Sequence, residues 1–401
     1  MNMTESVSAQ SVWAQSLSAQ FEETFGRAPA GVWEAPGRAN FIGEHTDYND
    51  GFVLPFALPY RTSVAAAPRT DRRVVAHSPA AGEPQQFALD GLAPGDVTGW
   101  ASYVAGTLWA LQRAGLEVPG MDLLVSSDVP IGAGLSSSAA LECAVGLAAL
   151  DLGGLDRSGG ELGISGLDLA RLAQTAENEF VGMPCGLMDQ AAAMCSKEGH
   201  FLLFDTASQD LEHIPVDLAA DEFELLIIDT RAPHRLVDGA YAQRRRECAQ
   251  AAAELGVESL RELHEQPQAQ DRIASIADPA ARRRARHVVS ENHRVIETVR
   301  LLRSSDVGGT GAQLSASHAS LRDDFEVTVP ELDVAADTAV AAGALGARMM
   351  GGGFGGCVIA LIPRRSAEVI RQALRDAFAE RGFTAPEFLQ AMPAAGARRV
   401  S

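Results

Sequence analysis

Residues 130–142, Pro-Ile-Gly-Ala-Gly-Leu-Ser-Ser-Ser-Ala-Ala-Leu-Glu, decide how the fold is interpreted. Gly132 and Gly134 allow the backbone to approach a ligand closely, and the serines at 136–138 begin a helical stretch whose first N–H groups lack partners within the helix. Because the helix dipole favours an anion at those donors, the stretch predicts a phosphate-binding corner. An ordinary strand–turn–helix corner with a serine cap has the same pattern and stays open at this point.

Strand-like and helical runs alternate along the rest of the chain without a fixed repeat. Strands are expected at residues 52–58, 62–67, 74–77, 121–126, 200–204, 223–229 and 357–363. Helices are expected at residues 10–26, 100–114, 136–152, 168–180, 187–195, 239–255, 278–303, 332–342 and 366–382. The spacing of a parallel βαβ fold is not evident, so the pattern indicates an α+β protein. The polar segment 209–222 favours a boundary between an N-terminal domain, 1–212, and a C-terminal domain, 213–401.

Composition and charge limit the function classes. The chain has 401 residues, 46% of them hydrophobic, and 33 basic against 52 acidic side chains give a net charge of −19. This length suits two or three domains with a substantial core. The acidic balance argues against a nucleic-acid or anionic-membrane partner, which would need clustered cations. Five scattered cysteines, no leader-like N-terminus and no apolar stretch of bilayer length predict a cytoplasmic protein.

A second glycine-rich segment, residues 351–357, is Gly-Gly-Gly-Phe-Gly-Gly-Cys. Arg348 precedes it and an apolar strand follows it. So many glycines are entropically costly, and they indicate that the backbone closely approaches a ligand or another part of the chain. Contact with phosphate and a tight turn into a buried strand are both consistent with the pattern.

A third segment, residues 37–51, is Gly-Arg-Ala-Asn-Phe-Ile-Gly-Glu-His-Thr-Asp-Tyr-Asn-Asp-Gly. Its glycines and its Asn-Asp-Gly end predict a loop, and the carboxylates of Glu44 and Asp47 suit the hydroxyls of a polyol. A solvated surface loop is the alternative, although two apolar residues inside the segment favour a loop packed on the core. His45 has no second histidine at ligand spacing, which disfavours a zinc site.

The three segments together resemble those of the galactokinase family within the GHMP kinase superfamily. GRANFIGEHTDYNDG is similar to the galactokinase signature, PIGAGLSSSAA to the superfamily's phosphate loop, and GARMMGGGFGGC to its third motif. The match runs in the family's order from about residue 31 to residue 363. The resemblance implies a two-domain GHMP kinase fold, with an N-terminal domain like the second domain of ribosomal protein S5 and a ferredoxin-like C-terminal domain. The active site would lie between them.

The resemblance also implies an activity and a set of site residues. It implies ATP-dependent phosphorylation of galactose at the C1 hydroxyl, the entry step of the Leloir pathway, with Mg²⁺ as cofactor. The catalytic base would be Asp189 of GLMDQ, faced by Arg38. The implied sugar contacts are Glu44, His45, Asp47, Gly186 and Tyr241. The implied ATP-binding residues are Gly132, Ala133, Gly134, Leu135, Ser136, Ser137, Ser138 and Ala139, and the implied magnesium ligands are Ser138 and Glu177.

Other interpretations stay open on the sequence. A related sugar kinase acting on N-acetylgalactosamine, arabinose or a uronic acid would share these segments, and so would a non-catalytic sensor of galactose and ATP. A hydrolase using Cys185 or one of the serines is disfavoured because no G-x-S-x-G elbow is present. The arginines at 244–246 are followed by Glu247, which favours an exposed helix face. The expected partners are galactose and ATP alone, bound to a monomer.

Overall fold

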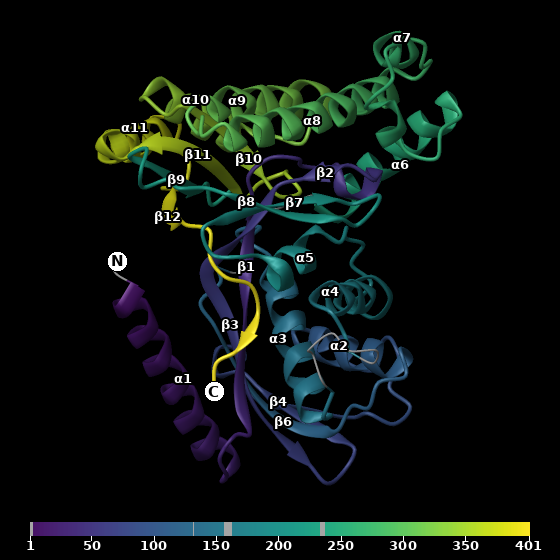
Figure 1. The fold of residues 1–401 in the computed structure, drawn as a ribbon, viewed down its shortest axis with the longest axis vertical. Coiled ribbons are helices and arrows are strands. Elements are labelled where there is room, and N and C mark those ends of the chain that lie inside the picture. Colours follow the sequence, from purple (N-terminus) through teal and green to yellow (C-terminus); the bar gives the residue numbers. More distant parts are fainter. Residues whose placement is uncertain (1–2, 131, 156–162, 233–236) are drawn as a thin grey trace.

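The computed structural model describes residues 3–130, 132–155, 163–232 and 237–401 of the chain. Ile131 of the predicted phosphate loop lies outside the described residues. Two lobes stand one above the other in Figure 1. The long strands β1 and β3 occupy the lower lobe, and helices α8 to α11 occupy the upper lobe. The mixture of helix and sheet in both lobes agrees with the expected α+β organisation.

The lower lobe is built on a sheet that is covered on both faces. Its six described strands run in the order β13-β1-β3-β6-β4-β5, and all the described pairings are antiparallel except that of β4 with β6. The strand bounds are β1 Gly31–Asn40, β3 Pro55–Arg69, β4 Arg73–His77, β5 Gln85–Ala88, β6 Gly120–Ser127 and β13 Arg398–Arg399. One face packs on α1 (Met3–Phe25), and the other on α2 (Ala101–Arg113), α3 (Ser137–Leu152), α4 (Gly166–Thr175) and α5 (Met188–Cys195).

The side chains of β3 alternate between the two faces of the sheet, which explains why both faces are apolar and covered by helices. Val64 and Ala66 belong to the core beneath α2 and α3, whereas Ala65 and Ala67 pack with α1. Successive side chains of a strand point to opposite faces, so an apolar run buries both. Helix α3 is apolar nearly all round because it lies at the centre of this lobe.

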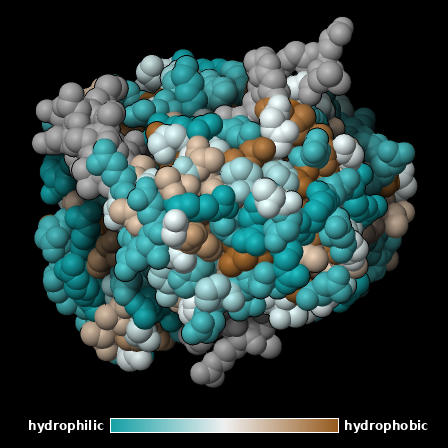
Figure 2. Space-filling view, turned by 90° about the horizontal axis from the view of Figure 1, so that it is seen from below, coloured by the Kyte–Doolittle hydropathy of each residue, from teal (hydrophilic) through white to brown (hydrophobic). Residues whose placement is uncertain are grey.

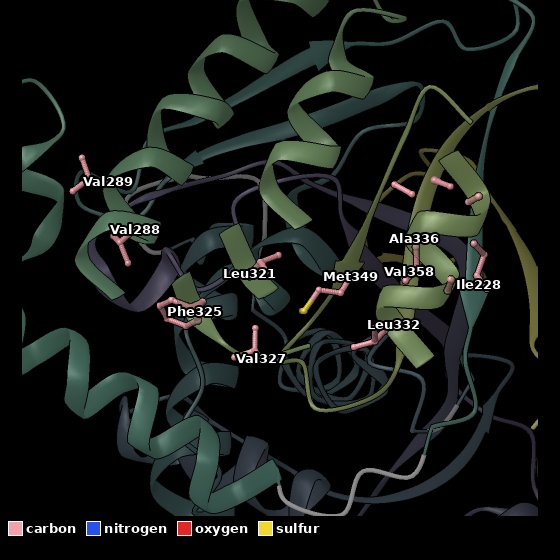
Figure 3. Packing of buried hydrophobic residues seen from close by; sticks show 14 of the residues in the cluster. Ile228, Val288, Val289, Leu321, Phe325, Val327, Leu332, Ala336, Met349 and Val358 are labelled. Carbon is pink, nitrogen blue, oxygen red and sulfur yellow. The ribbon is translucent and has the colours of Figure 1, made fainter. Parts of the chain in front are cut away.

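The upper lobe carries a four-stranded antiparallel sheet among the described residues. Its order is β10-β11-β9-β12, formed by β9 Phe223–Asp229, β10 Gly346–Met350, β11 Cys357–Pro363 and β12 Glu387–Ala391. Its helices are α6 Val237–Leu255, α7 Ala269–Ala274, α8 Pro279–Arg303, α9 Thr310–Ser320, α10 Pro330–Ala341 and α11 Ala367–Glu380. Figure 3 shows Leu332 and Ala336 of α10 packed over Val358 and Ile228 of this sheet.

A shared core connects the two lobes. A small sheet of β2 (Phe52–Val53), β7 (His200–Asp205) and β8 (Leu211–Pro215) lies between them. Phe41 stacks on Phe201 with ring centroids 4.7 Å apart, and both belong to a cluster that includes Ile359 and Met350 of the upper sheet. The apolar residues inside the 37–51 segment therefore do anchor it on the core.

Several elements differ from the sequence predictions. The runs 52–58 and 62–67 are mostly one long strand, β3, which continues through Pro59 although its pairing with β1 has a register shift between Ala57 and Arg61. The helix expected at 168–180 ends as α4 and continues as a π-helical segment, Ala176–Val181. β8 lies inside the predicted boundary segment, where its largely exposed residues hide the strand pattern. The division at residues 212 and 213 stays a prediction, and β13 pairs with β1 of the lower lobe.

The described helices include none that is both long and apolar enough to cross a bilayer. Figure 2 shows the face at the lower end of Figure 1, which is mainly hydrophilic, with hydrophobic residues in small separate patches. Such scattered apolar residues are ordinary on a protein surface.

The close approach of α9 to β10 generates a stability prediction. A Cβ added to Gly346 would lie 1.9 Å from the carbonyl oxygen of Gly311, which is backbone and cannot move aside. We expect Gly346→Ala to lower the free energy of unfolding by about 2 kcal/mol or more, as overpacking does. Urea denaturation measures this change. Gly239→Ala, at an open position near the start of α6, is the control and should be neutral or stabilising. Equal unfolding free energies for the two variants would contradict the prediction.

Candidate active site

A pocket of about 350 Å³ brings the 37–51 segment and the second glycine-rich segment together. This volume suits a small organic ligand. Its walls come from the 37–51 segment, the loop before α5, the start of α5, α6 and the second glycine-rich segment. The lining residues are Arg38, Glu44, His45, Asp47, Gly182, Met183, Pro184, Cys185, Gly186, Met188, Asp189, Tyr241, Gly351 and Gly352.

Arg38 and Asp189 form a bidentate ion pair at one wall of the pocket. Nε and Nη2 of Arg38, at the end of β1, each donate to one carboxylate oxygen of Asp189 at 2.8 Å. The hydroxyl of Ser136 also donates to Asp189. Burial alone would lower the pKa of Arg38, but the charges of Asp189 and Glu44 raise it, so the guanidinium stays cationic. The carboxylate is thereby fixed in orientation while its side chain keeps 24% exposure at the pocket.

Glu44 is held by donors from the second glycine-rich segment. Arg348 in β10, which is fully buried, donates to Glu44 Oε1 at 3.0 Å and to the carbonyl oxygens of Asn40 and Phe41 at 2.7 and 2.8 Å. The N–H of Gly351 donates to the same carboxylate oxygen at 2.7 Å. The sugar-signature loop, residues 41–51, is thus joined to the glycine-rich segment by charge-assisted hydrogen bonds.

His45 presents an uncharged ring to the pocket. Burial lowers its pKa well below the ordinary value for histidine. Nδ1 lies 2.8 Å from the hydroxyl of Tyr48, while Nε2 has no hydrogen-bond partner among the described residues. A ligand hydroxyl in the pocket would supply the missing partner, because a buried polar atom left unpaired is costly.

Asp47 and Gly186 are in direct contact across the pocket. A Cβ on residue 186 would lie 1.7 Å from Oδ2 of Asp47, so any larger residue there would displace the Asp47 carboxylate. Burial and the nearby carboxylates of Asp189 and Glu44 raise the pKa of Asp47 to about 7. Tyr241 completes this wall, with its ring centroid 5.7 Å from that of His45.

The first glycine-rich loop lies beside the ion pair. Its glycines 132 and 134 are exposed and adopt left-handed φ angles of 78° and 74°. The carbonyl oxygens of Ala133, Gly134 and Leu135 accept from Cys357 Sγ, Arg38 Nη1 and Arg38 N. With these carbonyl groups occupied by protein donors, the loop is better suited to an anion. Helix α3 begins next to it at Ser137, and its partly exposed N-terminus supplies the dipole expected for a phosphate site.

Glu177 and Ser138 lie next to each other. Burial and Asp189 raise the pKa of Glu177, against the hydrogen bond from Ser138 that lowers it. Gln190 Nε2 donates to Glu177 at 2.6 Å and to the fully buried Glu142 at 3.2 Å. A carboxylate and a hydroxyl next to a phosphate-type loop are the donors that Mg²⁺ prefers. The described residues hold no cluster of three or more His, Cys, Asp and Glu side chains, so a cation here would also need oxygens from its ligand or from water.

The structure thus brings the implied site residues into one region. The implied sugar contacts and both implied catalytic residues line the pocket, while Ser136 contacts Asp189 directly. Ser136 does not cap α3 as a serine cap would, since its side chain donates to Asp189 instead. The roles of all these residues remain predictions.

Some features were not found from the sequence. One is the buried ion pair of Arg348 with Glu44. An arginine inside an apolar strand is a sequence signal for such a pair. Gly182, Met183 and Pro184 were not expected to line the pocket, and Cys185 stood out in the sequence only as a possible nucleophile. The expectation that residues 244–246 form an exposed helix face is wrong for Arg244, which is 9% exposed and donates to the carbonyl oxygens of Phe325 and Glu326.

Known protein families match three parts of the chain. Residues 19–68 match the galactokinase galactose-binding signature, residues 102–197 the GHMP kinases N terminal domain, and residues 298–380 the GHMP kinases C terminal. A galactokinase of Streptomyces coelicolor is 47% identical over 390 residues, which cover 96% of this chain and 98% of the relative. The chain belongs to the galactokinase family. A galactokinase of Mycobacterium bovis is also 47% identical, over 90% of this chain and 97% of its own.

Solved structures agree with this assignment. The crystal structure of Lactococcus lactis galactokinase complexed with galactose superposes with a TM-score of 0.87 at 34% identity, covering 96% of this chain and 99% of the other. A mevalonate kinase matches with a TM-score of 0.64 at 16% identity, which shows the shared fold alone. The two-domain GHMP kinase fold expected from the sequence is therefore confirmed, and the protein is a kinase of that superfamily.

The ion pair of Arg348 with Glu44 generates a prediction. Arg348→Met leaves the Glu44 carboxylate buried without a cation, and we expect a loss of about 3–5 kcal/mol in the free energy of unfolding. Adding Glu44→Gln to this variant should restore part of the loss, because the uncompensated charge is then removed. Urea denaturation measures both changes, with Arg365→Met on the surface as control. The prediction fails if the double variant is less stable than Arg348→Met alone.

Proposed function

We propose that this galactokinase-family enzyme transfers the γ-phosphoryl group of ATP to the C1 hydroxyl of galactose, with Asp189 and Arg38 at the reacting atoms. The single observation that carries the proposal is the bidentate Arg38–Asp189 pair between the sugar-signature loop and the phosphate-type loop. A phosphoryl donor on one side and a sugar on the other would meet at this pair.

The pocket walls support a sugar as the acceptor. His45 offers an unpaired buried ring nitrogen, and Asp47 offers a carboxylate pressed against Gly186. A site built to pair particular hydroxyls rejects an epimer that leaves such groups unpaired. The Lactococcus lactis relative was crystallised with galactose, and its similarity supports galactose here.

Asp189 would accept the proton of the C1 hydroxyl as the oxygen attacks phosphorus. Because Arg38 neutralises it, the carboxylate acts more by alignment than by basicity. This suits a loose phosphoryl-transfer transition state, in which proton removal can be late. Arg38 also stabilises the negative charge that develops on the transferred group.

Magnesium fits the donor set at the α3 N-terminus. Ser138 and Glu177 would hold it, and the raised pKa of Glu177 indicates a carboxylate without a neighbouring cation to compensate it. Bound Mg²⁺ neutralises the triphosphate and orients it. The loop at residues 132–139 would bind the phosphates through backbone N–H groups.

The setting of the reaction is proposed on chemical grounds. ATP and free thiols both suit the cytoplasm, and each of the five cysteines is a free thiol. A monomer with galactose and ATP as its small-molecule partners remains the expectation.

Replacing Asp189 tests the chemical role. We expect Asp189→Asn to lower kcat by at least about a thousandfold, the loss typical of a removed general base, with galactose affinity changed by less than about threefold. ADP release gives the rate, and calorimetry gives the affinity. Asp337→Asn, on the exposed face of α10, is the control. Near-normal turnover of the Asp189 variant would remove this residue from the mechanism.

A panel of hexoses, N-acetylgalactosamine, arabinose and uronic acids, each with ATP and Mg²⁺, tests the substrate. ADP release should be greatest with galactose, and the product should carry phosphate at C1. Preference for N-acetylgalactosamine, arabinose or a uronic acid would make the protein a related sugar kinase. Binding of galactose and ATP without ADP release would make it a sensor.

The magnesium site has its own test. We expect Glu177→Gln to raise the Mg²⁺ concentration at half-maximal activity by about 10–100-fold, since a ligand is lost. The KM for galactose should change little. An unchanged Mg²⁺ dependence would exclude Glu177 as a ligand.

A further inference from the structure

Helix α8 (Pro279–Arg303) crosses the upper lobe, and no residue of it is among those lining the pocket. Three of its side chains nevertheless contact the backbone of the sugar-signature loop or of the strand that follows it. These residues, His287, Glu291 and Asn292, are fully buried. His287 and Glu291 are four positions apart and share one face of the helix, and Asn292 lies about 100° further around it.

His287 contacts the carbonyl group of Glu44. Its Nε2 lies 3.0 Å from the carbonyl oxygen of Glu44, and its Nδ1 lies 2.9 Å from the hydroxyl of Ser320. Burial lowers the pKa of His287 to about 4, so the ring is neutral near pH 7. A carbonyl oxygen only accepts, so Nε2 carries the proton and Ser320 donates to Nδ1.

Glu291 binds the N–H of Gly43, the residue before Glu44. Its Oε1 accepts from the N–H of Gly43 at 3.0 Å and from the hydroxyl of Ser317 at 2.7 Å. Its Oε2 accepts from Nε of Arg294 at 2.6 Å. Burial alone would raise the pKa of Glu291, but the charges of Arg294 and Arg348 help to lower it to about 2. A charged acceptor therefore fixes this N–H, which makes a strong hydrogen bond.

Asn292 fixes the far end of the loop. Its Oδ1 accepts from the N–H of Phe52 at 2.8 Å. A Cβ on Gly51 would lie 2.6 Å from the same oxygen, so the loop backbone is in direct contact with α8. The three α8 contacts thus bracket the pocket-facing residues of the loop on both sides.

The loop needs this support because its backbone is strained. His45 and Asp50 adopt left-handed φ angles of 64° and 56°, which are unfavourable for residues other than glycine. Such conformations persist only where the surroundings over-determine them. Simple core packing would not require a hydrogen-bond acceptor for the N–H of Gly43 together with a donor for the carbonyl oxygen of Glu44.

We propose that His287, Glu291 and Asn292 are positioning residues for sugar recognition, holding the backbone of residues 43–52 so that its polar side chains face the sugar. They act through the loop and touch neither substrate. The inference rests on the proposed function, since it assumes that this loop contacts the sugar.

The test compares His287→Leu with His287→Gln. Leucine removes the donor to Glu44, whereas the glutamine amide can reproduce it. For His287→Leu we expect the KM for galactose to rise at least about tenfold, with kcat changed less than about threefold and the KM for ATP less than about twofold. His287→Gln should return the KM for galactose to within about threefold of the wild-type value. Glu297→Gln, on an exposed part of α8, is the control and should change none of these values.

Two results would overturn the inference. One is an equal rise in both KM values, and the other is an unchanged KM for galactose in a folded His287→Leu variant. If His287→Leu does not fold, the double variant Ser317→Ala/Ser320→Ala decides, because it removes the supports of Glu291 and His287. It should raise the KM for galactose alone by about threefold, and no selective rise would overturn the inference.

Failure of the proposed function would look different. Wild-type protein would then show no galactose-dependent ADP release. If another sugar proved to be the substrate, the same comparison of variants with that sugar would still test the positioning role.

Discussion

The site depends on one buried cation, the guanidinium of Arg348. It lies in β10, an edge strand of the upper sheet, with no exposed surface, and it donates to two carbonyl oxygens and one carboxylate from the end of β1 and the loop that follows it. A buried guanidinium needs all its donors paired, so its partners fix where the sugar-signature loop can lie. Because this loop also reaches α8, the pocket wall that carries Glu44 and His45 is built largely from contacts between lobes. The loop at 132–139 and Glu177 belong to the lower lobe, and Ala133 of this loop also accepts from Cys357 of β11.

Asp189 lies between this pocket wall and the loop at 132–139. It is at the start of α5, its partner Arg38 ends β1, and Ser136 precedes α3. Three elements of one lobe therefore fix the carboxylate before any ligand arrives. If Asp189 has the proposed catalytic role, such preorganisation lowers the cost of alignment during the reaction.

Much of this arrangement could be predicted from the sequence, and the reasons are local. Glycines spaced like 132 and 134 predict a turn, and the structure gives both of them left-handed φ angles. The long apolar stretch after Ser137 predicts a helix at the centre of a domain. Glu44, Asp47 and Asp189 could be assigned to one site only because the family resemblance implies that these distant segments converge. Residue patterns alone gave no distance between positions 38 and 189.

What could not be predicted depends on tertiary contacts. His287 and Glu291 lie in a helix rich in arginine and glutamate, where a polar residue normally faces solvent. Their burial follows only once the sugar-signature loop packs against α8. The exposure predicted for Arg244 is wrong for the same reason, since its partners are the distant carbonyl oxygens of residues 325 and 326. β8 and β13 are short and half exposed, so their alternation is too weak to detect.

The pairing of β13 with β1 has a consequence for how the chain is made. During synthesis the lower sheet can assemble early, yet the outer edge of β1 keeps unsatisfied N–H and C=O groups until residues 398–399 emerge. For the whole time that the upper lobe is being translated, that edge is a template for wrong pairing with another nascent chain. Helix α1, which is translated before β1, packs on one face of the same sheet, over β3 and β6 as well as β1, so its contacts do not replace the missing partner at that edge.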